Sequence, residues 1–259
     1  MSDLSKVLLV IPHSGLIIPP EIPLNKVRMP AIHRIYKDAT IDRYTDQLYN
    51  FLSMTRIIFD YHRIFIDVNC NHLIDIEDIL PSYFEGIKVY NGWDPTKELR
   101  NQIVKKYICP FHKQIEMTDK RFILECHSSE KGSTDDNGKR VKKDIYLCDG
   151  QTYDHLPDKP DIKSAPSGLI EEYASQIRKI DKRLSVGINE LCYDIYGSIM
   201  DFHGIKNGQV FDKRVPLLLQ ETTETYYMKF DYVDARALTH LNRVCSEALT
   251  KALCKFKII

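Results

Sequence analysis

The chain lacks the features that mark several large classes of protein. Its 259 residues carry 36 basic and 36 acidic side chains, so the formal net charge is zero. Nucleic-acid-binding proteins usually carry a basic excess, and we therefore expect no nucleic-acid partner. No apolar run reaches the roughly 18 residues that a membrane span needs, and the first residues lack the charged start and long apolar stretch of a signal peptide. These absences predict a cytoplasmic globular protein with no membrane partner.

Cysteine is present, but its pattern does not indicate a covalent framework. The seven cysteines are odd in number, and no two of them have C-x-x-C spacing. This pattern argues against a disulfide framework and against a zinc ribbon. Reduced and mostly buried thiols in a cytosolic protein are the expectation.

Short apolar runs rich in β-branched residues predict the strands of the fold. They span residues 7–11, 56–59, 64–68, 122–126, 145–148, 186–188 and 215–220. Most are continuous rather than alternating, which is typical of parallel strands covered on both faces. Helical spacing of apolar residues predicts helices over 36–52, from 94 to 107, from 167 to 180 and over 233–256.

The alternation of strands with helices predicts an α/β fold, a three-layer α/β/α sandwich around a mostly parallel mixed sheet. Asp94 and Pro95 are suited to begin one helix, as N-cap and first helical residue. Pro110 is expected to kink or end that helix, and Ser167 could cap the next one. No internal repeat or linker divides the chain, and residues 1–259 are therefore predicted to form a single domain.

Two histidines stand at the ends of predicted strands, His13 after the first run and His127 after the run over 122–126. Open α/β sheets bind their ligands at the carboxyl ends of the strands, so these imidazoles could share one metal ion. Catalytic zinc usually has three protein ligands, and a carboxylate commonly joins the histidines. Asp38, Asp42 and Asp46 follow one another at i, i+4 and i+8 of the predicted helix, and Asp42 is the central choice. A solvated acidic face is the alternative for any one of them.

Further polar residues follow other predicted strands. Glu221 ends the run over 215–220, where poor solvation should raise the pKa of its carboxyl group into the range of a general base. A structural salt bridge is an equal alternative for Glu221. Arg63 could stabilise an oxyanion, and Asn69 could orient a substrate carboxylate or amide. Asp67 is expected to face the other way on the same strand and to support the fold.

Short segments spread along the chain resemble, in order, the motifs of the N-formylglutamate amidohydrolase family. The matching segments are 11–15 (IPHSG), 42–49 (DRYTDQLY), 63–69 (RIFIDVN), 110–112 (PFH), 126–128 (CHS), 219–221 (LQE) and 227–228 (YM). This family resembles a branch of the zinc-dependent carboxypeptidase and aspartoacylase superfamily. The resemblance implies a fold of the zinc exopeptidase type. It also implies a zinc-dependent hydrolase that cleaves a linear amide bond in a small N-acyl amino acid or peptide.

The same resemblance implies roles for individual residues. One zinc ion would have His13, Asp42 and His127 as its ligands, and a histidine-rich site favours zinc over manganese, cobalt or iron. Glu221 would be the catalytic acid and base, and Arg63 the polarising or substrate-binding arginine. Ser14 and Asn69 complete the predicted substrate-binding set. For His112, capping of the helix kink and a catalytic role both remain open.

One departure from the family pattern bears on the substrate. The family has Asn-Arg where this chain has Asn69 and Cys70, and a cysteine cannot make the bidentate contact of an arginine with a carboxylate. The metal centre is unaffected by this change, whereas the case for N-formylglutamate as substrate is weaker. Two alternatives remain: a non-catalytic family member that keeps the fold, with or without the metal, for binding, and a hydrolase that uses Cys70 or Cys126 as nucleophile.

Overall fold

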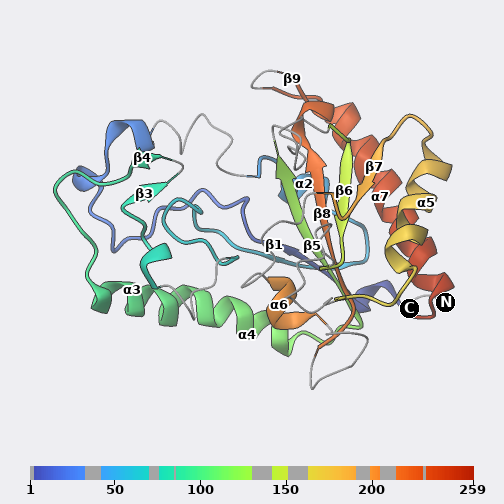
Figure 1. Ribbon diagram of the computed structural model, residues 1–259, viewed down its shortest axis with the longest axis horizontal. Helices are drawn as coiled ribbons and strands as arrows, with labels where there is room; N and C mark the ends of the chain where they lie inside the picture. Colours follow the sequence, from blue (N-terminus) through green and yellow to red (C-terminus); the bar gives the residue numbers. More distant parts are fainter. Residues whose placement is uncertain are drawn as a thin grey trace, which may run out of the picture.

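A mixed, mostly parallel sheet runs through the centre of the protein (Figure 1). Its six strands lie in the order β2-β1-β5-β8-β6-β7. The strands are β1 (Val7–Ile11), β2 (Thr55–Ile58), β5 (Phe122–Ser129), β6 (Ile145–Cys148), β7 (Val186–Ile188) and β8 (Leu217–Thr223). Neighbouring strands from β2 to β8 are parallel, β6 is antiparallel to β8, and β7 is parallel to β6. This computed structural model describes residues 3–32, 42–69, 76–84, 86–129, 142–150, 163–190, 199–204, 214–229 and 232–259.

Helices cover both faces of the sheet, which confirms the predicted α/β/α sandwich. On one face, α5 (Leu169–Ile180) and α7 (Ala235–Lys255) pack on the strand residues Leu9, Leu124 and Leu218. On the other face, α3 (Lys97–Ile103), α4 (Cys109–Met117) and α6 (Ile199–His203) pack on Leu8, Ile123 and Leu217. Successive residues of a strand point to opposite faces, so the continuous apolar runs supply both cores.

The remaining elements are short. They are η1 (Leu4–Lys6), η2 (Leu24–Lys26), α2 (Thr45–Leu48), η3 (Ile76–Asp78), η4 (Val104–Ile108) and η5 (Glu224–Tyr226), with the two-residue strands β3 (Tyr83–Phe84), β4 (Ile87–Lys88), β9 (Met228–Lys229) and β10 (Tyr232–Val233). Within the described part of the chain, no helix combines the length and the apolar character that a membrane crossing requires.

One predicted strand is wrong. Residues 64–68 form a turn in which the amides of Phe65 and Ile66 both donate to the carbonyl of His62, at 3.0 and 3.2 Å. Four of these five residues are apolar and fully or almost fully buried in the core beneath α3 and α4. A continuous apolar run indicates burial, and here a buried turn produced the same pattern as a buried strand.

The predicted helix boundaries also need correction. In the 36–52 segment, only Thr45–Leu48 is helical among the described residues, because Tyr44 adopts a left-handed φ of 60° just before it. The next helix begins after Thr96, not Asp94, since the Thr96 hydroxyl accepts a hydrogen bond from the amide of Leu99 at 3.2 Å. Gly168 rather than Ser167 precedes α5.

Pro110 does not end its helix. The chain passes from α3 through the π-helical turn η4 into α4, and Pro110 lies in the first turn of α4. Proline lacks an amide proton and therefore removes one hydrogen bond from the helix. The wider π-helical turn η4, just before Pro110, accommodates this missing hydrogen bond without ending the helix. The two helices therefore form one long rod, in which α4 lies near the sheet and α3 extends away from it toward β3 and β4 (Figure 1).

The cysteines differ in state. Cys109, Cys126, Cys245 and Cys254 are free thiols, as predicted. Cys148, at the end of β6, is disulfide-bonded, so the prediction of reduced cysteines is wrong for this residue.

Candidate metal centre and active site

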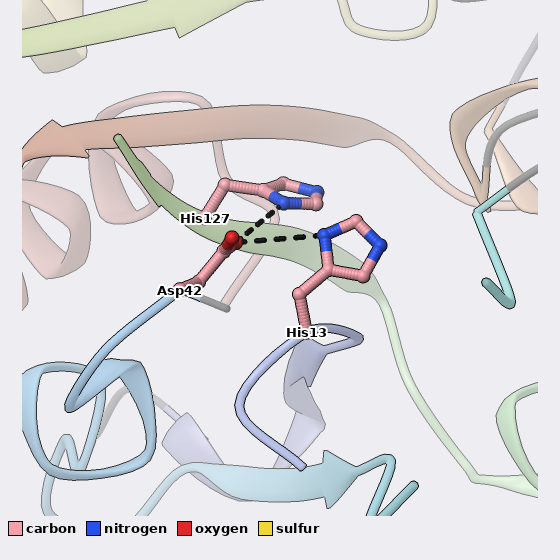
Figure 2. Close-up of side chains that lie close together, drawn as sticks. All are labelled: His13, Asp42 and His127. Atoms are coloured by element: carbon pink, nitrogen blue, oxygen red, sulfur yellow. Dashed lines mark hydrogen bonds and ion pairs between the residues drawn. The ribbon is translucent and has the colours of Figure 1, made fainter. Parts of the chain in front are cut away.

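The carboxyl ends of three adjacent strands meet at the predicted site. His13 lies two residues beyond the end of β1, and His127 lies on the neighbouring strand β5. Glu221 lies on β8, where it is the register partner of His127. Register partners on parallel strands project to the same face of a sheet, so His127 and Glu221 share one face. Asp42 reaches the same place from the loop before α2 (Figure 2).

His13, Asp42 and His127 form a compact buried group. Their ligand atoms all lie within 4.8 Å of one another. The Oδ2 atom of Asp42 is 2.9 Å from Nδ1 of His127 and 3.6 Å from Nδ1 of His13 (Figure 2). The two imidazole rings are inclined at 57° with their centroids 4.8 Å apart. The structure thus brings the three predicted ligands together, and their role as ligands stays a prediction.

The chemistry of this group fits a divalent metal ion. Nδ1 of His13 is buried and has no hydrogen-bond partner among the described residues, although a carboxylate oxygen lies nearby. A cation between these atoms would satisfy this nitrogen, which lacks a partner in the described part of the chain. Two imidazole nitrogens and one carboxylate oxygen are also a donor set of catalytic zinc sites, which keep a fourth position for water. The residues present therefore fit a zinc ion.

Charges around the group favour the ionised form of Asp42. Burial alone would raise the pKa of this carboxyl group, but the nearby imidazoles of His13 and His127 outweigh burial and hold the pKa below its ordinary value. An ionised carboxylate is the form that binds a metal ion.

The Asp42 backbone is fixed on both sides. Its amide donates to the carbonyl of His13 at 3.1 Å, and its own carbonyl accepts from the Thr45 hydroxyl at 2.7 Å. The amide of Ser128 donates to Oδ2 of the Asp42 carboxylate at 3.2 Å. These contacts tie Asp42 to the segments that carry the two histidines.

A buried carboxylate anchors the next residue of the same loop. Glu224 follows β8, and its side chain accepts hydrogen bonds from the amide and the Nε atom of Arg43, both at 3.0 Å. The Ser128 hydroxyl donates to the same carboxylate at 3.0 Å. The loop that presents Asp42 is thereby held against the ends of β5 and β8.

Asp67 lies in the site, contrary to the prediction that it faces away. Its Oδ1 atom is 2.8 Å from Nε2 of His13, and its Oδ2 atom accepts from Nη2 of Arg63 at 3.0 Å. The prediction assumed strand alternation, and alternation does not apply to the turn that residues 64–68 form. The pKa of Asp67 lies below its ordinary value because the charges of His13 and Arg63 outweigh the opposing effect of burial.

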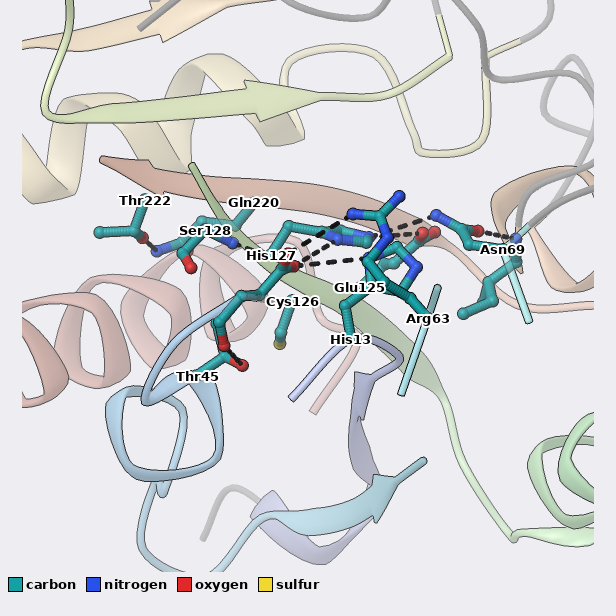
Figure 3. Close-up of polar contacts among 12 residues, drawn as sticks. His13, Thr45, Arg63, Asn69, Glu125, Cys126, His127, Ser128, Gln220 and Thr222 are labelled. Carbon is teal, nitrogen blue, oxygen red and sulfur yellow. Dashed lines mark hydrogen bonds and ion pairs between the residues drawn. The ribbon is translucent and has the colours of Figure 1, made fainter. Parts of the chain in front are cut away.

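Arg63 lies beside the carboxylates of the group. Its Nη1 atom is 3.7 Å from Oδ1 of Asp42, and its Nε atom has no hydrogen-bond partner among the described residues (Figure 3). Burial would lower the pKa of the guanidinium, but Asp67 and Asp42 raise it, so Arg63 stays positively charged.

Glu125 is a site residue that the sequence analysis missed. It lies two residues before His127 on β5, is fully buried, and places Oε1 2.9 Å from Nε2 of His127. A signal for it exists in the sequence, because residues i and i+2 of a strand project to the same face. A carboxylate two residues before a strand histidine can therefore reach its ring.

The remaining predicted residues differ in their surroundings. Glu221 is half-buried, and burial raises the pKa of its carboxyl group against the opposing charge of His127. Nδ2 of Asn69 is 3.3 Å from Nε2 of His127, and Oδ1 of Asn69 accepts from the amide of Ile199 at 2.8 Å. The hydroxyl of Ser14 is buried and lacks a hydrogen-bond partner within the described part of the chain.

The other described residues that the sequence offers as ligands, nucleophiles or catalytic groups are not part of the group of His13, Asp42 and His127. Asp46 is in α2 and outside the compact group, and Asp38 and Cys70 lie outside the described residues. Cys126 is fully buried in the core on the opposite face of β5, and burial raises the pKa of its thiol well above the ordinary value, which contradicts a role as nucleophile. His112 is in α4, with Nδ1 3.0 Å from Nε2 of His203.

Comparisons with known proteins identify the fold and the family of the chain. An N-formylglutamate amidohydrolase from Ralstonia eutropha is 17% identical, with a TM-score of 0.67 over 100% of this chain and 96% of that one. A gene product of Agrobacterium tumefaciens is 15% identical, with a TM-score of 0.68 over 98% of this chain and 92% of that one. No curated protein matches the chain. The family model for N-formylglutamate amidohydrolase matches residues 5–194, and the chain belongs to the N-formylglutamate amidohydrolase family.

Proposed function

We propose that this protein is a zinc-dependent hydrolase that cleaves the amide bond of a small N-acyl amino acid or peptide. Membership of the family supports an amide-hydrolysing function. The buried group of His13, Asp42 and His127 carries the proposal of metal dependence. A divalent cation would bind the Nδ1 atom of His13, which has no hydrogen-bond partner in the segments that the structure describes, and the ionised carboxylate of Asp42.

In this proposal, the three buried side chains hold the zinc ion through nitrogen and oxygen donors. When bound, zinc lowers the pKa of a water molecule toward about 7 and polarises the carbonyl group of the substrate. Glu221 accepts the proton of the attacking water and later donates it to the departing nitrogen. The raised pKa of the half-buried Glu221 carboxyl group suits both steps, because a general base works best when its pKa is near the working pH.

Arg63 and the neighbouring polar groups handle the substrate. As the reaction proceeds, negative charge develops on the carbonyl oxygen. The guanidinium of Arg63 can donate to it from Nε–H, for which the described residues supply no acceptor. Asn69, beside His127, and the buried hydroxyl of Ser14 are proposed to orient the substrate. Cys70 stands where the family has an arginine. We therefore propose an N-acyl amino acid or peptide as the substrate class and do not single out N-formylglutamate.

Metal content and turnover together test the proposal. Purified protein should contain zinc by elemental analysis, lose turnover on a panel of N-acyl amino acids and peptides after chelation, and regain it when zinc is added. Glu221→Gln should retain zinc and lose about 10²- to 10⁴-fold in turnover, since it cannot transfer the proton. Glu247→Gln, which alters a partly exposed carboxylate on α7, is the matched control and should leave both unchanged.

Two outcomes would contradict the proposal in different ways. Full turnover by the chelated protein would show that the reaction needs no metal. Zinc-loaded protein that hydrolyses nothing in the panel would favour a family member that keeps the fold and the metal for binding.

A further inference from the structure

We propose that Asp67 and Glu125 are positioning residues, each of which holds one histidine so that its Nδ1 atom faces Asp42. This inference rests on the proposed metal centre and adds two residues to it. Each residue contacts the Nε2 atom of one histidine and acts through that ring.

The two histidines are held in the same way. Oδ1 of Asp67 is 2.8 Å from Nε2 of His13. Oε1 of Glu125 is 2.9 Å from Nε2 of His127 (Figure 3). On both rings, the other nitrogen, Nδ1, faces Oδ2 of Asp42. A carboxylate accepts hydrogen bonds and cannot donate them, so it fixes a proton on Nε2. The lone pair of each Nδ1 atom is then available to a metal ion.

Asp67 is itself held in place. Its carboxylate accepts from Nη2 of Arg63 at 3.0 Å and from the amide of Asn69 at 2.8 Å. The turn over residues 64–68 therefore delivers an oriented acceptor to the ring of His13. A rotation of that ring would break its contact with Asp67.

Glu125 has a more unusual position. It is fully buried in the centre of the sheet, and within the described residues its carboxyl group has His127 as its hydrogen-bond partner, while its Oε2 atom has none. Burial of an incompletely paired carboxyl group costs free energy, and an apolar side chain would avoid that cost. Orientation of His127 is a role that accounts for a carboxyl group at this position.

The amide variants Asp67→Asn and Glu125→Gln test the inference because they keep the shape of each side chain and remove its charge. Loss of such a partner typically weakens metal binding about 10- to 100-fold, so each variant should bind zinc more weakly by that factor. The two carboxylates act on different histidines, and the double variant should therefore bind zinc more weakly than either single variant.

A matched control exists elsewhere in the fold. Oδ2 of Asp181, just after α5, is 2.7 Å from Nε2 of His240 on α7, which is the same kind of pair outside the metal centre. Asp181→Asn should alter the melting temperature and leave zinc affinity unchanged. This contrast separates a positioning role from a general loss of stability.

The measurements use the full chain. Zinc dissociation constants are obtained by competition with a chromophoric chelator, and ¹⁵N NMR of the zinc-loaded wild type should show protons on Nε2 of His13 and His127. If the wild type binds zinc and both variants bind it as tightly as the wild type does, the positioning role is wrong and the proposed function stands. If the wild type binds no zinc, the positioning role and the proposed function are both wrong. If the core rejects Glu125→Gln and that variant does not fold, the partly exposed Asp67 still decides the outcome.

Discussion

Acidification from pH 6.5 to 4 should destabilise this protein through His62. The imidazole is fully buried, its Nδ1 atom accepts from the amide of Ile64 at 3.1 Å, and its Nε2 atom has no hydrogen-bond partner among the described residues. Burial, reinforced by the charges of Arg63 and His13, lowers the pKa of His62 from 6.5 to about 4. The folded protein therefore keeps this ring neutral over a range of pH in which the unfolded chain protonates it.

The direction and size of the effect follow from proton linkage. Between pH 6.5 and 4 the unfolded state binds more protons at this position, so the free energy of unfolding falls as the pH falls. The shift of about 2.5 pH units, from 6.5 to about 4, multiplied by about 1.4 kcal/mol per unit, gives a loss that approaches about 3.5 kcal/mol below pH 4. About 2 kcal/mol of this should already be lost at pH 5.

Urea unfolding of metal-free protein at a series of pH values measures this loss. His62→Asn is the informative variant, because an asparagine oxygen can accept from the Ile64 amide in place of Nδ1 but does not titrate. The variant should be less stable at neutral pH and should depend less steeply on pH than the wild type between 6.5 and 4. If the two proteins lose stability in parallel over this range, His62 is not the group that carries the effect.

Outcomes are expected for three further variants and for one matched control. Arg63→Lys keeps a positive charge but loses the planar contact with Asp67, and kcat/KM on an accepted substrate should fall about 10²- to 10³-fold; an unchanged value would place Arg63 outside the reaction. Tyr49→Phe removes a buried hydroxyl that contacts two backbone carbonyls and a threonine, and should lower the free energy of urea unfolding by about 1–2 kcal/mol. Leu241→Ala, in the core between α7 and the sheet, should cost about 2–5 kcal/mol in the same assay. Leu52→Ala, 84% exposed, should stay within about 0.5 kcal/mol of the wild type, and equal losses for the two leucines would contradict the described core.

The sheet could be predicted well because its strands are buried on both faces. Six of the predicted strand positions are strands in the structure, with ends that differ by at most a few residues. Burial on both faces leaves continuous apolar runs, and such runs are visible in a single sequence. The one wrong strand, over residues 64–68, is also buried, which shows that the run reports burial and not backbone conformation.

The proximity of His13, His127 and Glu221 could be predicted for the same reason. Each follows or ends an apolar run, and the ends of neighbouring parallel strands meet at one edge of a sheet. The sequence favours Asp42 as the central one of three aspartates on a continuous helix. The prediction of a continuous helix is wrong, because Tyr44 is left-handed and the described helix begins only at Thr45. A left-handed residue cannot be read from a helical spacing of side chains, because the spacing carries no information about φ.

The roles of Asp67 and Glu125 could not be predicted from sequence patterns. The direction of the Asp67 side chain depends on the turn that its segment forms, and this turn depends on tertiary contacts that the local sequence does not show. Glu125 lies inside an apolar run, and the run predicts a buried strand without indicating a function for the single charged residue in it. The single-domain organisation and the cytoplasmic location stay predictions.

The placement of one acidic residue on β8 and of a second directly after it links assembly of the site to the alignment of the sheet. Glu221 pairs in register with His127, and Glu224, three residues later, secures the loop of Asp42 through Arg43. A one-residue slip of β8 against β5 would turn Glu221 to the opposite face, and a two-residue slip would carry it about 7 Å away from His127. Either slip would also release the Asp42 loop. The proton-transfer group and the support of a proposed ligand are thus completed in a single folding event, and a mispaired sheet would lack both at once.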